Sequence, residues 1–139
     1  MSDVINLEVG QAAPNFSCID SNGDKHSLEQ YKKDGKSVIL YFYPKDSTPG
    51  CTKQACDFRD SMSRLNNGDY VVLGVSKDSA KSHDKFIAKQ DLNFPLLMDE
   101  DTSLHELYGT WREKSMYGRT YMGTSRSTFV IGSDGNLKW

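Results

Sequence analysis

The sequence predicts an α/β fold of three layers, in which a central mixed sheet is flanked by helices on both faces. Two observations support this class. Short runs of apolar and β-branched residues, typical of buried strands, alternate with segments whose apolar residues recur every three or four positions, which is typical of helices. Strand–helix–strand alternation implies right-handed crossovers, which place helices on both sides of one sheet.

The N-terminal part of the chain predicts a β-hairpin. Residues 15–19 alternate around the apolar Phe16 and Cys18, and residues 20–23 (Asp-Ser-Asn-Gly) are typical of a turn. The chain then returns through residues 25–27. We expect this hairpin to precede the central sheet.

Three apolar runs of strand length predict the central sheet: residues 38–43, 70–75 and 128–131. They are apolar almost throughout, as expected of strands that are buried on both faces. After the last run, residues 133–136 predict a turn that leads into residues 137–139.

Helical patterns lie between these runs. One helix begins near Cys51, and its apolar residues form a narrow stripe: Ala55, Phe58, Met62 and Leu65. A second is expected from Ser79, a capping residue, to Gln90. A third is expected over residues 102–108, where Gly109 ends it.

Size, composition and charge exclude several classes of function. A chain of 139 residues fits one domain over residues 1–139. Hydrophobic residues make up 37% and charged residues 26%, which excludes a disordered tail and a membrane protein. The net charge of −2 gives no basic excess for binding nucleic acid. Because the N-terminus does not resemble a secretory signal, we expect a cytoplasmic protein.

The residues from the strand at 38–43 to the helix after it suggest a reactive cysteine. Thr48 suits the position before the helix and Pro49 its first residue, which puts Cys51 in the first turn. Free N–H groups and the positive end of the helix dipole stabilise a thiolate there, and the thiolate is the nucleophile. A lone cysteine is more often a small buried hydrophobe, but a capped helix start after a core strand favours the reactive role.

Cys56 lies five residues beyond Cys51. In a helix the two Cα atoms are roughly 8–9 Å apart and about 140° around the axis, too far for a disulfide. Either Cys56 is incidental, or the helix must unwind for the two cysteines to join. Three cysteines without a signal peptide do not describe a disulfide framework, and Cys18 is expected to pack on an apolar strand face.

Arg126 directly precedes the strand at 128–131. A cation there could stabilise a thiolate and a negatively charged leaving oxygen, although an ordinary surface arginine is equally consistent with its position.

Other patterns give no site. The three histidines, His26, His83 and His105, lack the spacing of metal ligands and are expected to cap, pack or be solvated. Residues 118–125 resemble a phosphate-binding loop but lack its lysine, and the acidic residues 99–101 are expected to form a solvated turn that opens a helix. We therefore expect no metal, nucleotide or other cofactor.

The pattern Pro44-x-x-x-Thr48-x-x-Cys51 resembles the active site of peroxiredoxins. With the surrounding residues 41–60, it is similar to the bacterioferritin comigratory protein, or peroxiredoxin Q, subfamily. Similarity covers residues 10–139 and includes residues 94–99 and 127–131.

This resemblance implies a thioredoxin-like fold and a thiol-dependent peroxidase that reduces hydrogen peroxide and organic hydroperoxides. It makes Cys51 the peroxidatic cysteine and Cys56 the resolving cysteine, which form an intramolecular disulfide. Thr48 holds the thiolate and the peroxide, Pro44 shields the pocket and Arg126 is the pocket arginine. A thioredoxin-like dithiol is the implied reductant, and a monomer the implied state.

The chain departs from the subfamily at two places. Gln54 stands where a glutamate is usual, which keeps the hydrogen-bonding capacity and loses the charge, so the rate is affected rather than the reaction. The chain also ends at Trp139, so we expect the C-terminal strand and helix of the family to be missing.

Two other functions share Cys51. A non-catalytic thiol redox sensor or chaperone-like module would consume peroxide slowly and substoichiometrically. A general disulfide oxidoreductase would reduce insulin, which the Cys51–Cys56 spacing does not favour because such enzymes use Cys-x-x-Cys.

Overall fold

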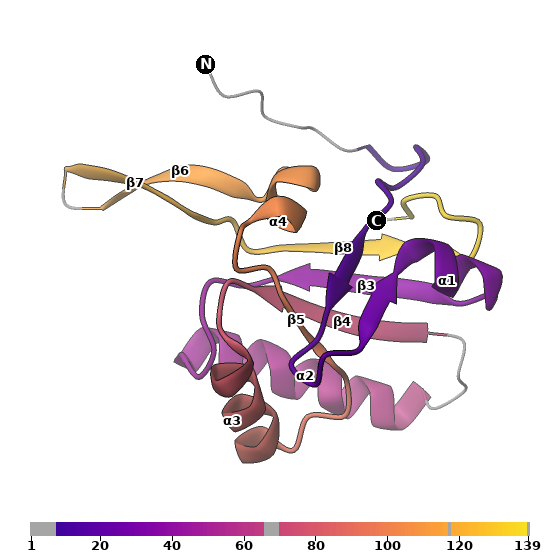
Figure 1. Ribbon diagram of the computed structural model, residues 1–139, viewed down its shortest axis with the longest axis horizontal. Helices are drawn as coiled ribbons and strands as arrows, with labels where there is room; N and C mark the ends of the chain where they lie inside the picture. The colour runs from indigo at the N-terminus through magenta and orange to yellow at the C-terminus, as the bar shows by residue number, and fades with distance from the viewer. Residues whose placement is uncertain (1–7, 66–69, 117, 139) are drawn as a thin grey trace.

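The computed structural model describes residues 8–65, 70–116 and 118–138 (Figure 1). The strands of the described chain are β1 (Ser17–Ile19), β2 (Lys25–Ser27), β3 (Ser37–Phe42), β4 (Tyr70–Ser76), β5 (Leu96–Met98), β6 (Trp111–Met116), β7 (Arg119–Thr124) and β8 (Ser127–Ile131). The helices are α1 (Leu28–Lys33), α2 (Pro49–Leu65), α3 (Ala80–Gln90) and α4 (Ser103–Leu107).

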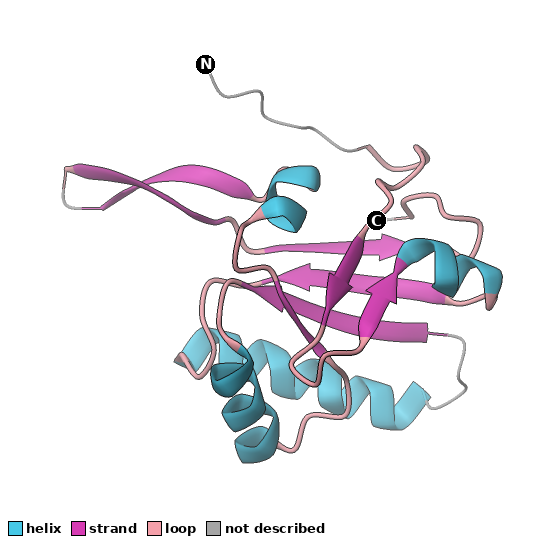
Figure 2. Ribbon diagram, in the orientation of Figure 1, coloured by secondary structure: helices cyan, strands magenta, loops and turns pink. Residues whose placement is uncertain are grey.

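The central sheet is mixed, with the strand order β5-β4-β3-β8. β3 pairs parallel with β4, and β4 pairs parallel with β5, whereas β8 runs antiparallel to β3. The other two sheets are hairpins, β1-β2 at the N-terminal side and β6-β7, which extends away from the sheet (Figure 2). The predicted mixed sheet and N-terminal hairpin are confirmed.

Alternating residues of β3 enter two separate cores, which makes the fold three-layered. Val38, Leu40 and Phe42 pack with residues of α1 and α4 on one face. Ile39 and Tyr41 pack with residues of α2 and α3 on the other. Figure 1 shows these two helix pairs on opposite sides of the sheet. Both faces of the strand are covered, which fits its apolar run from Val38 to Phe42.

The predicted helix starts are close to those observed. α2 begins at Pro49, and α3 is preceded by Ser79, whose Oγ accepts a hydrogen bond from the Ser82 amide at 3.3 Å. α4 follows Thr102 and ends two residues before Gly109. The stripe side chains of Met62 and Leu65, and residue 139 of the last predicted segment, lie outside the description.

Asp99 corrects one expectation. The acidic residues 99–101 open α4 as predicted, but Asp99 is only 2% exposed and is not solvated. Its carboxylate accepts hydrogen bonds from the backbone amides of Leu104 and His105 and from the His105 ring. Glu100 and Asp101 are exposed, as expected. In the described part of the chain, no helix has the length and apolar character needed to cross a bilayer.

Candidate active site

Cys51 is the third residue of α2, which confirms that it lies in the first turn of the helix. The chain reaches this point directly from β3 through a loop at residues 43–48. Cys51 packs against the apolar layer between α2 and the sheet, with Tyr41, Tyr43 and Ala55 in the same core. The N-terminal turn supplies backbone N–H groups and a positive dipole end, both of which favour negative charge on the sulfur.

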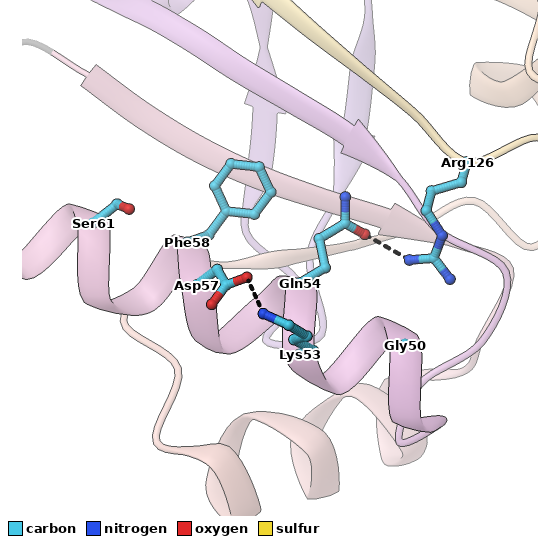
Figure 3. A pocket seen from close by; sticks show the side chains of 7 residues that line it. All are labelled: Gly50, Lys53, Gln54, Asp57, Phe58, Ser61 and Arg126. Carbon is cyan, nitrogen blue, oxygen red and sulfur yellow. Dashed lines mark hydrogen bonds and ion pairs between the residues drawn. The ribbon is translucent and has the colours of Figure 1, made fainter.

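Arg126 binds the sulfur directly. It lies between β7 and β8, and its Nη2 donates a hydrogen bond to Cys51 Sγ at 3.1 Å. Its Nη1 donates to Gln54 Oε1 at 2.8 Å, one turn further along α2 (Figure 3). A guanidinium in this position stabilises a thiolate. Its second hydrogen bond, to Gln54, fixes the orientation of the guanidinium plane. The structure therefore favours the interpretation of Arg126 as a residue that stabilises the sulfur over that of an ordinary surface arginine.

Gln54 supplies the acceptor for one Arg126 N–H through its amide oxygen. A neutral amide keeps the hydrogen-bonding capacity of a carboxylate without its charge.

Thr48 and Pro44 are not joined to the sulfur by any hydrogen bond of the described residues. The Thr48 carbonyl accepts the first helical hydrogen bond, from the Thr52 amide at 2.8 Å. Its hydroxyl donates a hydrogen bond to the Lys45 carbonyl at 3.0 Å, so this side chain stabilises the loop before the helix. Pro44 is exposed just after β3. Their roles toward peroxide remain predictions.

Cys56 is half-buried on the same helix and faces α3. Its Sγ donates to Gln90 Oε1 at 3.5 Å. All three cysteines are free thiols here, and α2 is continuous from Cys51 to Cys56, so the roughly 8–9 Å Cα separation expected of helical geometry applies. Cys56 can reach Cys51 only if the first turns unwind.

An open groove of about 480 Å³ lies between α2 and Arg126. Its lining residues are Gly50, Lys53, Gln54, Asp57, Phe58, Ser61 and Arg126, all drawn in Figure 3. Cys51 is 1% exposed and does not line this groove. The sulfur is therefore not reached directly from this groove. Arg126 lies between them: it lines the groove, and its guanidinium contacts the sulfur.

Cys18 packs as predicted, on β1, with its Sγ 3.3 Å from the Met98 carbonyl oxygen. Burial, followed by the negative charge of Asp99, raises the pKa of the Cys18 thiol to about 11. A thiol with this pKa is protonated near neutral pH and is a poor nucleophile.

A polar cluster that no sequence pattern predicted joins the loop before Cys51 to α3. One carboxylate oxygen each of Asp46 and Asp78 and one ring nitrogen of His83 lie within 4.8 Å of one another. These atoms already have partners: His83 Nδ1 lies 2.6 Å from Asp46 Oδ2, and Asp78 Oδ2 accepts from the Asp46 amide and Ser76. They are engaged with each other, so we interpret the cluster as a hydrogen-bond network.

Comparisons with known proteins give the family of the chain. The model of the AhpC/TSA family matches residues 9–139. The chain is 50% identical over 131 residues to a putative peroxiredoxin Bcp of Coxiella burnetii and 47% identical over 131 residues to peroxiredoxin Bcp of Bacillus subtilis. Each alignment covers 94% of this chain, and 85% and 82% of the two relatives.

A solved structure of the bacterioferritin comigratory protein of Xanthomonas campestris, described by its alkyl peroxide reduction activity, superposes with a TM-score of 0.83. It is 38% identical, and the alignment covers 99% of this chain and 85% of that one. The thioredoxin-like fold and the peroxidase class expected from the sequence are confirmed. The chain therefore belongs to the AhpC/TSA family, as a peroxiredoxin of the bacterioferritin comigratory protein, or peroxiredoxin Q, group.

Proposed function

We propose that the chain reduces hydrogen peroxide and organic hydroperoxides through Cys51, with Cys56 as the resolving cysteine and a thioredoxin-like dithiol as reductant. The observation that carries this proposal is the pairing of Cys51 Sγ with the Arg126 guanidinium in the first turn of α2. The alkyl peroxide activity of the Xanthomonas relative supports the choice of substrate class.

In the first step the Cys51 thiolate attacks one oxygen of the peroxide. A sulfur–oxygen bond forms, the oxygen–oxygen bond breaks, and the leaving oxygen takes a proton to become water or an alcohol. Sulfur is oxidised by two electrons to a sulfenic acid. Arg126 and the free amides of the helix start stabilise the charge that develops on the leaving oxygen. Because Cys51 is 1% exposed and does not line the groove, a local movement around the sulfur must admit the peroxide before this step.

In the second step the first turns of α2 unwind and the Cys56 thiol attacks the Cys51 sulfenic acid. A disulfide forms and water leaves. Unwinding breaks the contacts of Arg126 with Cys51 and Gln54, the contact of Cys56 with Gln90, and backbone hydrogen bonds of the first turns, such as that from the Thr52 amide to Thr48 O. An external dithiol then reduces the disulfide by exchange, and the helix reforms. We expect the chain to act as a cytoplasmic monomer, with Thr48 and Pro44 bordering the peroxide.

Two cysteine variants test the proposal. Cys51→Ser should abolish peroxide consumption driven by a dithiol. Cys56→Ser should consume one equivalent of peroxide and leave a Cys51 sulfenic acid that a dimedone reagent labels. Cys18→Ser is the matched control and should turn over like the parent protein, because Cys18 lies on the far face of the sheet from α2. Turnover by Cys51→Ser would contradict the proposal.

A further inference from the structure

Asp46 is the most heavily anchored residue of the loop that leads to Cys51. Its side chain is buried, with 5% of the residue exposed. Oδ1 accepts a hydrogen bond from the Tyr43 hydroxyl at 2.5 Å, and Oδ2 accepts from Ser82 Oγ at 2.9 Å and faces His83 Nδ1 at 2.6 Å. The backbone amide donates to Asp78 Oδ2 at 2.7 Å. The anchors come from Tyr43 directly after β3, from the β4–α3 loop and from α3.

His83 connects this anchor to the sheet. It is fully buried, and its second ring nitrogen, Nε2, lies 2.9 Å from the Leu97 carbonyl oxygen of β5. Since a carbonyl only accepts, Nε2 is the donor to Leu97, while Nδ1 faces Asp46 Oδ2. The ring therefore bridges the loop and β5 through two directed hydrogen bonds.

Beyond Asp46 the loop becomes strained and then loosely held. Ser47 has a φ of +62°, a left-handed conformation that a non-glycine residue keeps only when its surroundings impose it. The anchors on Asp46 lie directly before this residue. From residue 47 to 50, the side-chain hydrogen bond of the described residues is the local one from Thr48 to Lys45.

The helix α3 also holds the chain at and beyond Cys56. Gln90, two turns after His83 on α3, accepts from Cys56 Sγ through its side chain and from Arg59 Nη1 through its carbonyl, at 2.6 Å. Asn93 Nδ2 also donates to the Arg59 carbonyl at 3.1 Å. α3 thus contacts the chain before Cys51, at Asp46, and beyond Cys56, at Arg59.

We propose that the Asp46–His83 pair is a positioning device that fixes the N-terminal boundary of α2 unwinding, so that Cys51 moves toward Cys56 from a stationary hinge. The proposal rests on the two-conformation cycle described above. In the folded state the hinge places Cys51 against Arg126. In the unwound state Asp46 stays on α3, because none of its bonds involves a residue that must move.

Hydrogen exchange in the unmodified protein tests the boundary. Reduced protein and protein oxidised with one equivalent of hydrogen peroxide are compared at single amides. The Thr52 amide, bonded to Thr48 O in the helix, should lose at least tenfold protection on oxidation. The Asp46 amide should change by less than about threefold. Equal loss at both amides would overturn the hinge, whereas failure to form the Cys51–Cys56 disulfide would overturn the proposed function instead.

Two substitutions of His83 separate its two hydrogen bonds. Asparagine places an amide N–H where Nδ1 was and keeps the bond to Asp46, while glutamine reaches the Nε2 position and keeps the bond to Leu97. His83→Gln should slow the reaction of Cys51 with peroxide by about 10- to 100-fold, as misplacement of a reacting group does. His83→Asn should stay within about threefold of the parent protein.

A second buried histidine provides the matched control. His105 is also fully buried, and its Nδ1 lies 2.6 Å from Asp99 Oδ2, but it packs on the opposite face of the sheet from Cys51. His105→Gln should lower the melting temperature as His83→Gln does, yet leave the peroxide step within about threefold. If both glutamine variants slow that step equally, His83 has only a structural role. Should His83→Gln not fold, the exchange experiment still decides the hinge.

Discussion

Replacement of Arg126 by methionine removes the guanidinium and keeps much of the aliphatic volume. Arg126 Nη2 lies 3.1 Å from Cys51 Sγ. At an effective dielectric constant of 20, two unit charges at that distance attract by roughly 5 kcal/mol, an upper bound because Arg126 is exposed and solvent screens the pair. A hydrogen bond to a charged group contributes about 1.5–3 kcal/mol. With 1.36 kcal/mol per factor of ten, Arg126→Met should slow the peroxide step by roughly 10- to 100-fold.

The assay is rapid-quench oxidation of Cys51 with excess peroxide, followed by mass spectrometry of the modified thiol. The rate constant of Arg126→Lys should fall between those of the parent protein and Arg126→Met. An ammonium can reach the sulfur but lacks the planar fork that also bonds Gln54. Arg112→Met is the control, since Arg112 is an exposed arginine on β6 that bonds the Gly109 carbonyl. A rate constant for Arg126→Met within twofold of the parent would refute the assigned role of the guanidinium.

Three further predictions concern reactivity and stability. Because its pKa is raised to about 11, Cys18 should react with iodoacetamide at pH 7.5 far more slowly in the folded protein than in the urea-unfolded protein, as judged by peptide mapping; equal rates would contradict the effect of its burial. Burial alone would raise the pKa of Asp99, but hydrogen bonds from His105 and two amides outweigh it and lower the pKa. Ionised Asp99 therefore stabilises the fold above the ordinary carboxyl pKa of about 3.9, and this stability is lost as the pH falls below that value. Asp99→Asn should reduce the pH dependence of the unfolding free energy below about pH 3.9, measured by urea titration. An unchanged slope would exclude the effect. Gly74→Ala should destabilise the protein by about 1–3 kcal/mol in the same titrations, because its Cβ would lie 2.7 Å from Leu96 Cδ2, and an unchanged midpoint would show that this core yields.

The elements predicted correctly are those with a strong local signal. β3 and β4 are continuous apolar runs, and α2 and α3 begin after Thr48 and Ser79, which are residues typical of helix starts. No local pattern predicted α1, β5 or the β6–β7 hairpin. β5 is only three residues long, and β6–β7 pairs with itself through a largely polar sequence, so neither shows the periodicity from which strands are recognised.

The site was predicted in its parts rather than in its contacts. Cys51 in the first turn of α2 followed from helix-start residues nearby, and Arg126 was a candidate from its place before β8. The bond between them joins residues 75 positions apart, which no local pattern encodes. The same applies to Asp46 and His83, 37 positions apart, where the histidine was expected to cap, pack or be solvated and is buried as a bridge. The sequence signal for this pair was an acidic residue, Asp46, in the loop after a core strand.

The central claim is that Cys51 alone reacts with peroxide and that Cys56 then joins it. The direct measurement is the addition of one equivalent of hydrogen peroxide to reduced protein, followed by alkylation of the remaining thiols and mass spectrometric mapping. The account predicts a Cys51–Cys56 disulfide and an alkylated Cys18 in the same molecules. An alkylated, unoxidised Cys51, or a disulfide that contains Cys18, would contradict it.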